Sequence, residues 1–326
     1  MKAITIDDVA TFANVSKSTV SQYLNGRYEY MSDKTKIRIR EAIEELGYQP
    51  NIIARSLKQK STKTIGVIVA NILHSFSTQV IRAIEDVFHT YDFHMIVCNA
   101  DDKPEKEKKY IDMLRAKQVD GLIIFPTGGN MELYQKLIQG NFPLIFLDRF
   151  VKDLPIPSVM LDNFEASRLA VQYLHEQDCE RIGIITASTI QNVSPRMERI
   201  QGFNQAMEQL GKPICSDYIH SVETHMVQNV VEKMIHLEQP PDGLIAGNDL
   251  TLLAILHTLK EKSVEMKLVG IDDVPFANLM NPPLTTIAQP TFDMGKAAAE
   301  LLLKKINHEQ EECTPIKRFP PTLLVR

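Results

Sequence analysis

From residue 64 onward, short apolar runs alternate with longer segments in which apolar residues recur every three or four positions. The short runs predict strands and the longer segments predict amphipathic helices. The predicted strands are Ile65–Ala70, His94–Cys98, Gly121–Phe125, Leu144–Leu147, Ile182–Thr186, Tyr218–Val222, Gly243–Ala246 and Lys267–Ile271. The predicted helices lie near 75–90, 104–117, 131–140, 163–177, 195–210, 224–237 and 249–262. This alternation predicts parallel sheets covered on both faces, and its two similar halves predict two lobes.

The N-terminal part of the chain has a different pattern, that of short helices with polar residues at their starts. Thr5 and Asp8 have the spacing of a capping box, and the helix that they open carries its apolar residues on one face. Ser16 is placed to cap a second helix that ends at Asn25, and Ser32 is placed to cap a third. The first two helices, joined by a tight turn, predict a helix-turn-helix, whose second helix lies in the major groove of DNA.

The second of these helices has one apolar and one polar side. Val20 and Leu24 are expected to be buried. The outward positions carry side chains that can bond phosphate oxygens and base edges, namely Lys17, Ser18, Ser21 and Gln22. The alternative is a small helical bundle without a nucleic-acid ligand, but a polar row on so short a helix favours DNA binding.

Charge and composition agree with a DNA-binding head on a larger body. The chain has 326 residues and a net charge of −5, yet its first 63 residues hold eleven Lys and Arg against seven Asp and Glu. A basic head on an acidic body is typical of a protein that touches a polyanion with one end. No apolar run approaches the roughly eighteen residues of a membrane span, and MKAITIDDVATFANV lacks the pattern of a signal peptide. The four scattered cysteines form no CxxC pair, which predicts reduced thiols and a cytoplasmic location.

The strings IDDVATFANVSKSTVSQYLNG and MSDKTKIRIREAIEELGYQPNIIARSLK resemble the lactose/galactose-repressor (LacI/GalR) family, and the resemblance continues through the whole chain. It implies a small all-α helix-turn-helix head and a two-lobed α/β body of the periplasmic-binding-protein-like type I fold, built from two parallel-sheet, Rossmann-like subdomains. The implied domains are 1–60, with a hinge helix at about 51–58, and 61–326, which binds effector and dimerises. The expected N-lobe comprises about 64–161 and 275–290, and the expected C-lobe about 163–272 and 291–326. Three crossovers would join the lobes, near Asp162-Asn163, near Asp273–Pro290 and in the final strands.

The resemblance also assigns roles to residues of the head. The implied base-reading residues are Lys17, Ser18 and Gln22, and the implied phosphate-positioning residues are Thr5, Ser16, Thr19, Ser21 and Asn25. Many members have Arg where this chain has Gln22, so the operator is expected to differ at the base read there.

The stretch NIIARSL resembles the hinge helix of the family. It is too short to be stable alone, and in the family two such helices fold against each other in the minor groove. The resemblance implies that Leu57 is the apolar wedge between base steps, helped by Ala54, with Asn51 and Arg55 near the backbone. The alternative reading is an interdomain linker, and the two are compatible: a linker without DNA and a helix on it.

Polar residues directly follow apolar strands in the body, where the cleft of an open α/β sheet is lined. They include His74, Ser75 and Phe76, Asp148 and Arg149, Asn248, and Asp272. Each alone is more often a helix cap or a turn, but together they predict a sugar-binding ring, since carboxylates and amides bond hydroxyl groups and an aromatic ring stacks on a sugar face. There is no HExxH, GxSxG or phosphate loop, and the nine histidines are scattered, so neither an enzyme, a metal site nor a bound cofactor is expected.

The resemblance sharpens this cleft into an effector site. In RMERIQGF, Arg199 takes the position of the effector-binding arginine of the family, and Asn248, Asp272 and Asp148 also match effector-contacting positions, while Arg149 and Arg196 match less securely. Arginines facing one cleft suit an anionic ligand, because guanidinium binds carboxylate bidentately. The tracts VCNADDKPEKEK, SPRMER and TTIAQPTFDMG resemble the branch that regulates the use of 2-keto-3-deoxygluconate and related sugar acids.

The expected protein is therefore a cytoplasmic transcriptional repressor of carbohydrate catabolism that leaves a near-palindromic operator when a sugar or sugar acid binds. The strand-like tail PPTLLVR has no leucine heptads after it, which favours a homodimer over a tetramer. Three alternatives remain: a corepressor or a phosphorylated partner protein in place of an inducer, a sugar-binding transport protein of the same fold, and a sugar-acid enzyme.

Overall fold

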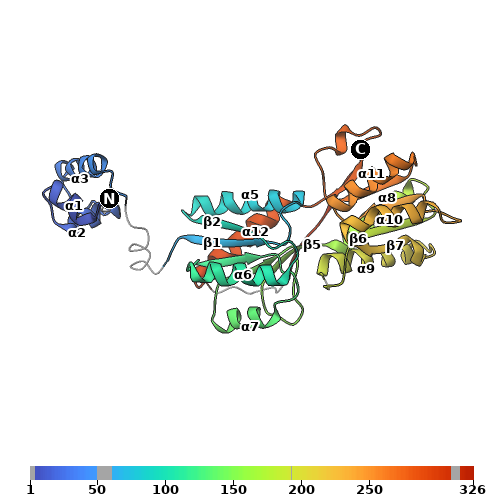
Figure 1. The fold of residues 1–326 in the computed structure, drawn as a ribbon, viewed down its shortest axis with the longest axis horizontal. Helices are drawn as coiled ribbons and strands as arrows, with labels where there is room; N and C mark the ends of the chain where they lie inside the picture. The colour runs from blue at the N-terminus through green and yellow to red at the C-terminus, as the bar shows by residue number, and fades with distance from the viewer. Residues whose placement is uncertain (1–3, 50–60, 192, 310–315) are drawn as a thin grey trace. The chain divides into compact units, whose positions relative to one another are not determined.

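The computed structural model describes residues 4–49, 61–191, 193–309 and 316–326, and the chain divides into two units, Met1–Thr62 and Lys63–Arg326 (Figure 1). The boundary lies within two residues of the expected one between head and body. The expected hinge residues Asn51, Ala54, Arg55 and Leu57 lie outside the described residues. No helix in the described part of the chain is long and apolar enough to cross a membrane.

The head contains three helices, α1 (Ile6–Phe12), α2 (Lys17–Leu24) and α3 (Asp33–Leu46). The capping box predicted at the start of α1 is present: the Thr5 side chain accepts from the Asp8 N–H, and the Asp8 carboxylate accepts from the Thr5 N–H at 2.7 Å. Val9, Val20 and Ile39 are fully buried, one from each helix. The apolar periodicity thus determines how the three helices pack.

The N-lobe is built on a parallel sheet with the strand order β11-β5-β4-β3-β1-β2. Its strands are β1 (Thr64–Val69), β2 (His94–Asn99), β3 (Gly121–Ile124), β4 (Leu144–Leu147), β5 (Ser158–Leu161) and β11 (Ile316–Phe319). Its helices are α5 (Ser75–Thr90), α6 (Pro104–Ala116), α7 (Met131–Gln139) and α12 (Thr291–Ile306). Alternate side chains of β1 face opposite layers, Val67 toward α5 and α12 and Ile68 toward α6 and α7. The sheet is therefore covered on both faces, as predicted (Figure 1).

The C-lobe repeats this plan around a sheet with the order β12-β10-β9-β8-β6-β7. Its strands are β6 (Ile182–Ala187), β7 (Ile219–Val222), β8 (Gly243–Ala246), β9 (Lys267–Ile271), β10 (Thr285–Ala288) and β12 (Thr322–Leu324), of which only β12 pairs antiparallel in the described sheet. Its helices are α8 (Asn163–Glu176), α9 (Ser194–Gln209), α10 (Val227–Ile235) and α11 (Asp249–Lys262), with short 3₁₀ turns at Ser216–Tyr218, Thr224–Met226 and Ala277–Leu279. The sheet lies between α8 and α9 on one face and α10 and α11 on the other.

The chain passes between the lobes three times, after β5, between β10 and α12, and between β11 and β12. These positions agree with the expected crossovers, but the lobe boundaries differ. The segment 275–290, expected in the N-lobe, contributes β10 to the C-lobe sheet. In the segment 291–326, expected in the C-lobe, α12 and β11 belong to the N-lobe and only β12 to the C-lobe.

α12 belongs to the N-lobe because one face of this helix consists of small residues that pack against α5. Ala297, Ala298 and Ala299 are buried, and Gly295 lies so close to α5 that an added Cβ would come within 2.8 Å of the Ala83 Cβ. Only a helix with such small side chains can approach α5 that closely. The sequence of α12 has a helical pattern, although this helix is not among the predicted ones, and nothing local to that pattern indicates which lobe receives it.

Candidate functional site

A cavity lies between the two lobes of the body, at the carboxyl ends of the strands of both sheets, and it encloses about 490 Å³ including its open mouth. Such ends are where open α/β sheets bind ligands, because strand termini leave the chain free to present polar side chains. The lining residues are Ala70, Asn71, His74, Phe76, Ser77, Phe125, Asp148, Arg149, Val193, Pro195, Arg196, Arg199, Asn248, Asp272 and Gln289.

The structure brings together every predicted effector residue except Ser75. Phe76, Asp148 and Arg149 come from the N-lobe, and Arg196, Arg199, Asn248 and Asp272 come from the C-lobe. Ser75 is absent from the lining: its N–H donates to Oδ2 of Asp249 at 2.6 Å, and its hydroxyl accepts from Gln79 at 3.1 Å.

Arg199, on α9, is held by residues of the first crossover. Its Nε donates to Oδ1 of Asn163 at 2.9 Å and its Nη1 donates to the carbonyl of Gly247. The amide nitrogen of Asn163 in turn donates to Oε2 of Glu198 at 3.1 Å. The carboxylate of Glu198 also accepts hydrogen bonds from Nη1 and Nη2 of Arg318, on β11, at 2.9 and 2.6 Å. Two crossover segments thereby fix the direction of the arginine.

Arg149 and Arg196 share one carboxylate, that of Asp102 in the loop after β2. Nη1 of Arg149 donates to Oδ1 of Asp102 at 2.7 Å, and Nη2 of Arg196 donates to Oδ2 at 3.0 Å. Burial disfavours the charge on Asp102, but Arg149 and Arg196 outweigh it and lower the pKa of that carboxyl below its ordinary value. Because the arginines belong to different lobes, this carboxylate is also a bridge across the cleft.

Asp272 has the opposite electrostatics. It is 5% exposed, and burial raises its pKa to about 6, although Arg199 nearby works in the other direction. Its carboxylate accepts from the amide of Gln289 at 2.5 Å and from the N–H of Asp249 at 3.4 Å. A carboxyl group in the cavity wall with a pKa of about 6 can accept a hydrogen bond from a ligand hydroxyl when it is ionised and donate one when it is protonated.

A second contact crosses the cleft between His74 and Asp249. Nδ1 of His74, at the start of α5, lies 2.6 Å from Oδ1 of Asp249, at the start of α11. Burial opposes ionisation of Asp249, but the hydrogen bond and charge of His74 and the N–H of Ser75 lower its pKa. The lobes therefore meet at both His74–Asp249 and Asp102–Arg196.

The loop after β3 makes a third close approach between the lobes. Gly128 has φ of +94° and lies so near the C-lobe that a Cβ would come within 2.7 Å of the Gln191 carbonyl oxygen. The buried carboxylate of Glu107 holds this loop by accepting from the Thr127 N–H at 2.7 Å and from the amide of Asn130 at 3.0 Å. Gly128 therefore lies in a turn at a contact between the lobes.

His74, which the pattern placed with Ser75 and Phe76 after the first strand, lies in the cavity lining. Sequence reasoning missed Asp102, which bridges the cleft, and Gln289, which lines it. Asp102 follows β2 in the same topological position as the residues that were selected. Gln289 gave no such signal, because β10 itself was not predicted from its short apolar run.

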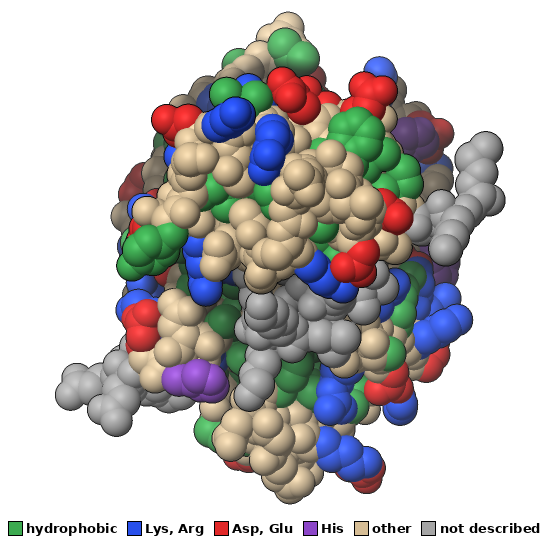
Figure 2. Space-filling model, turned by 90° about the vertical axis from the view of Figure 1, so that its left-hand side faces the viewer, with side chains coloured by type: hydrophobic (Ala, Val, Ile, Leu, Met, Phe, Trp, Pro, Cys, Tyr) green, Lys and Arg blue, Asp and Glu red, His purple; other side chains and the backbone are tan. Residues whose placement is uncertain are grey.

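The predicted DNA-contacting surface of the head is solvent-exposed at its main positions. Lys17, Ser18 and Gln22 are exposed, whereas Thr19 and Ser21 are half-buried. The remaining predicted residues make local contacts: Ser16 accepts from the Thr19 N–H at 3.1 Å, Thr5 belongs to the capping box, and the Asn25 amide donates to the Ser21 carbonyl at 2.6 Å. Lys17 pairs with Asp7 at 2.8 Å, with both side chains more than half exposed. Figure 2 shows Lys and Arg mixed with Asp and Glu across the visible face, so charge alone does not mark the interface.

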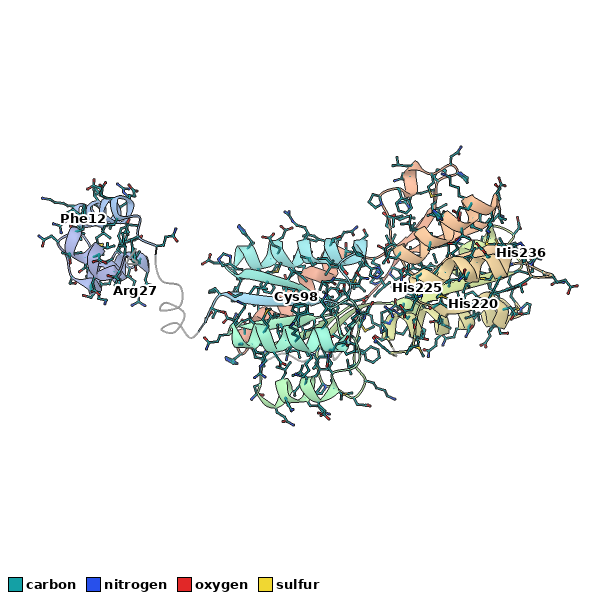
Figure 3. All side chains as sticks on the ribbon, in the orientation of Figure 1. Phe12, Arg27, Cys98, His220, His225 and His236 are labelled. Atoms are coloured by element: carbon teal, nitrogen blue, oxygen red, sulfur yellow. The ribbon has the colours of Figure 1, made fainter. Side chains whose placement is uncertain are left out.

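The described residues contain no group of three or more His, Cys, Asp or Glu side chains that could hold a metal ion. The labelled His220, His225 and His236 lie on the C-lobe in Figure 3, whereas Phe12 and Arg27 lie on the head. His220 and His236 each contact a main-chain carbonyl of the same neighbourhood, that of Asp217 at 2.9 Å and that of Glu232 at 2.6 Å. These contacts are local, and they fit a packing role.

Comparison with known proteins decides the family. The family described as bacterial regulatory proteins, lacI family, matches residues 5–51, and the family described as periplasmic binding proteins and sugar binding domain of LacI family matches residues 62–318. The chain belongs to the LacI family. It is a ligand-responsive DNA-binding transcriptional regulator and not an enzyme, with the helix-turn-helix head and two-lobed body that the sequence predicted.

Two curated LacI-family relatives match nearly the whole chain. The probable HTH-type transcriptional regulator EndR of Paenibacillus polymyxa is 44% identical and covers 98% of this chain and 96% of its own length. The HTH-type transcriptional regulator KdgR of Bacillus subtilis (strain 168) is 33% identical and covers 94% of this chain and 92% of its own.

Two solved structures of the family also match. The lac repressor dimer bound to operator and the anti-inducer ONPF has a TM-score of 0.87 at 24% identity, covering 100% of this chain and 98% of that chain. The complex of the transcriptional regulator CelR with cellobiose has a TM-score of 0.74 at 25% identity, covering 99% of both chains.

Proposed function

We propose that this LacI-family regulator represses genes of carbohydrate catabolism and leaves a near-palindromic operator when a sugar or sugar acid binds in the cleft. The proposal rests on the convergence of Phe76, Asn248, Asp272 and Arg199 in one cavity between the lobes. An aromatic ring, an amide, a carboxyl and a guanidinium are the groups that bind a polyhydroxylated ligand.

One unpaired atom in the wall supports a ligand rich in hydrogen-bond donors. Oε1 of Gln289 is buried and has no hydrogen-bond partner within the described part of the chain, while the amide nitrogen of the same side chain is bonded to Asp272. An unsatisfied buried acceptor is costly, and a ligand hydroxyl would satisfy it. A carbohydrate presents several such hydroxyls.

The finer proposal is a sugar-acid effector, and it rests on the arginines in the lining. Arg199 is 6% exposed, and its Nη2 makes no hydrogen bond to any described residue, which leaves that nitrogen for a ligand carboxylate. The tracts VCNADDKPEKEK, SPRMER and TTIAQPTFDMG, which resemble the branch that regulates the use of sugar acids, agree with this proposal. A neutral sugar is the second candidate, because Arg149 and Arg196 already share the carboxylate of Asp102.

The proposed mechanism couples closure of the lobes to the DNA-binding heads of a homodimer. Ligand contacts from both lobes would favour the closed body, and the change at the dimer interface would alter how the two short hinge helices pack on the operator. Such helices are stable only with help from their partner and the DNA, so a small shift suffices to release them. The coupling is reciprocal: operator DNA must weaken inducer binding by the same factor by which inducer weakens operator binding.

Two measurements test this function. Calorimetric titration with 2-keto-3-deoxygluconate, D-gluconate and neutral hexoses should show tightest binding for a sugar acid, and tighter binding of a neutral hexose would contradict the finer proposal. A gel-shift titration on operator DNA should then show release by the same compound. Tighter operator binding in its presence would instead identify a corepressor, and a response only to a phosphorylated partner protein would identify that third mode.

A further inference from the structure

Asp102 stands between the two arginines in the arrangement that a carboxylate ligand would adopt. Each of its oxygens accepts from a different guanidinium, Oδ1 from Arg149 at 2.7 Å and Oδ2 from Arg196 at 3.0 Å. The side chain of Arg149 is 6% exposed and that of Arg196 is 14% exposed, so little water competes for these contacts. Charge-assisted hydrogen bonds of this kind are the strong ones in proteins.

The two arginines line the cavity, but Asp102 does not. The Asp102 carboxylate therefore balances the charge of Arg149 and Arg196 without lining the cavity itself. The guanidinium groups of both arginines still face the cavity. Arg149 is further compensated by Asp148, whose Oδ2 lies 3.4 Å from its Nε. A ligand that enters the cleft consequently meets guanidinium donors whose positive charge is already largely balanced.

The loop that carries Asp102 is held in an uncommon backbone conformation. Asp101 and Asp102 have φ of +52° and +54°, two consecutive residues in the left-handed region. The Asp102 N–H donates to the Ala70 carbonyl at 2.7 Å. Such a conformation is unfavourable for residues other than Gly, although Asp and Asn tolerate it, and it persists only where the surroundings fix it. Here the fixed loop directs one carboxylate at two arginines.

We propose that Asp102 sets the charge selectivity of the effector cleft: it lowers the affinity for ligands that carry a carboxylate and leaves the affinity for neutral sugars of the same size unchanged. An anionic ligand must share Arg149 and Arg196 with a resident anion, whereas a neutral polyol needs only hydrogen bonds from them. Asp102 is thus a positioning and selectivity residue that need not contact the effector. The inference rests on the proposed function only in placing the effector in this cavity.

The test is the variant Asp102→Asn, measured by calorimetry against two matched pairs of probes at constant ionic strength. The pairs are D-gluconate with D-glucitol, and D-galacturonate with D-galactose, which differ in the presence of the carboxylate. Asparagine keeps the shape and an acceptor oxygen, and it tolerates the left-handed backbone. We expect at least one acid to bind about tenfold more tightly to the variant than to the wild type, and the neutral probes to bind equally to both.

Two further variants separate charge selectivity from a general structural effect. Asp101→Asn removes the neighbouring carboxylate, which is exposed and pairs with Lys106 at 2.5 Å, and it should leave all four affinities unchanged. Asp102→Asn combined with Arg196→Gln restores the charge balance, so it should lose the gain in acid affinity. A thermal melt of each variant shows whether it is folded.

The outcomes are separable from those of the proposed function. If Asp102→Asn gains no affinity for either acid, or loses affinity for acid and neutral probes alike, Asp102 does not set charge selectivity and the inference is wrong. If the acid affinity rises but no sugar or sugar acid releases operator DNA, the selectivity stands and the proposed effector response fails.

Discussion

The guanidinium of Arg199 is oriented by a residue of the first crossover, through a hydrogen bond of 2.9 Å from its Nε to Oδ1 of Asn163. Asn163 is fully buried and also donates to Glu198. Its amide therefore connects Arg199 in the cleft to the first crossover between the lobes. A side chain that belongs to a crossover therefore orients Arg199, a proposed effector-binding residue.

Replacing Asn163 with Ala should weaken effector binding about tenfold, because the Arg199 guanidinium loses the acceptor that orients it. It should also lower the free energy of unfolding by about 1–3 kcal/mol, since the buried Nε of Arg199 is left without its acceptor. Calorimetric titration and urea unfolding measure the two effects. The control is Ser167→Ala, which removes a buried hydrogen bond of 2.8 Å to the Arg199 carbonyl but leaves the guanidinium held. Equal losses of affinity in both variants would refute the orienting role of Asn163.

The cap of the recognition helix should contribute to both stability and DNA binding. Ser16→Ala removes the acceptor of the Thr19 N–H and should cost about 1 kcal/mol of head stability. Ser32→Ala removes the equivalent cap of α3, at 3.3 Å from the Thr35 N–H, and should cost a similar amount. Operator affinity, measured by fluorescence anisotropy, should fall further for Ser16→Ala if Ser16 also positions a phosphate. The same loss of operator affinity in both variants would mean that Ser16 acts only as a helix cap.

Gln22 should determine one base of the operator. It is exposed on α2, and Gln pairs bidentately with adenine whereas Arg pairs with guanine. Gln22→Arg should therefore shift the preferred base pair toward one that presents guanine, by about tenfold or more, without changing effector affinity. A binding selection on randomised operators measures the shift, with Gln22→Ala as the variant that should lose preference there. An unchanged base preference in Gln22→Arg would show that this side chain does not read DNA.

Asp272 should make stability depend on pH in a defined direction. Burial raises its pKa from the ordinary 3.8 to about 6, so the folded protein holds this proton more tightly than the unfolded chain does. The stabilisation from protonation is complete below about pH 4 and is lost as the pH rises through about 6, which amounts to about 3 kcal/mol for a shift of this size.

The measurement is urea unfolding of the wild type and of Asp272→Asn between pH 4 and 7.5. The difference between the two proteins isolates Asp272 from the other titrating groups. Relative to the variant, the wild type should lose stability as the pH rises from about 4 to about 6 and then stay level. A wild type that stays level against the variant over that range would mean that the carboxyl is held ionised and would contradict the raised pKa.

Local pattern was sufficient for most of the elements and their ends. Thr5 and Asp8 form the predicted capping box, and Ser16 and Ser32 cap the helices that follow them, because caps depend on residues three positions apart. The central strands β1, β3, β4, β6 and β8 are buried on both faces, so their apolar runs are nearly continuous. The short strands β5, β10 and β11 escaped prediction because they do not stand out as apolar runs: TTIA in β10 and IKRF in β11 are half polar, and SVML in β5 follows a proline-rich segment.

The sequence by itself determined most of the helices and strands, the helix caps and the chemical types that follow the strands, and its family resemblance indicated the crossover positions. The tertiary structure decided which lobe receives α12, and it decided that Asp102 and Arg196, 94 residues apart, and His74 and Asp249, 175 residues apart, meet across the cleft. Periodicity and capping act over a few residues, whereas these pairs arise only when the packing of whole sheets brings two loops together. The charge balance of the cleft depends on those pairs.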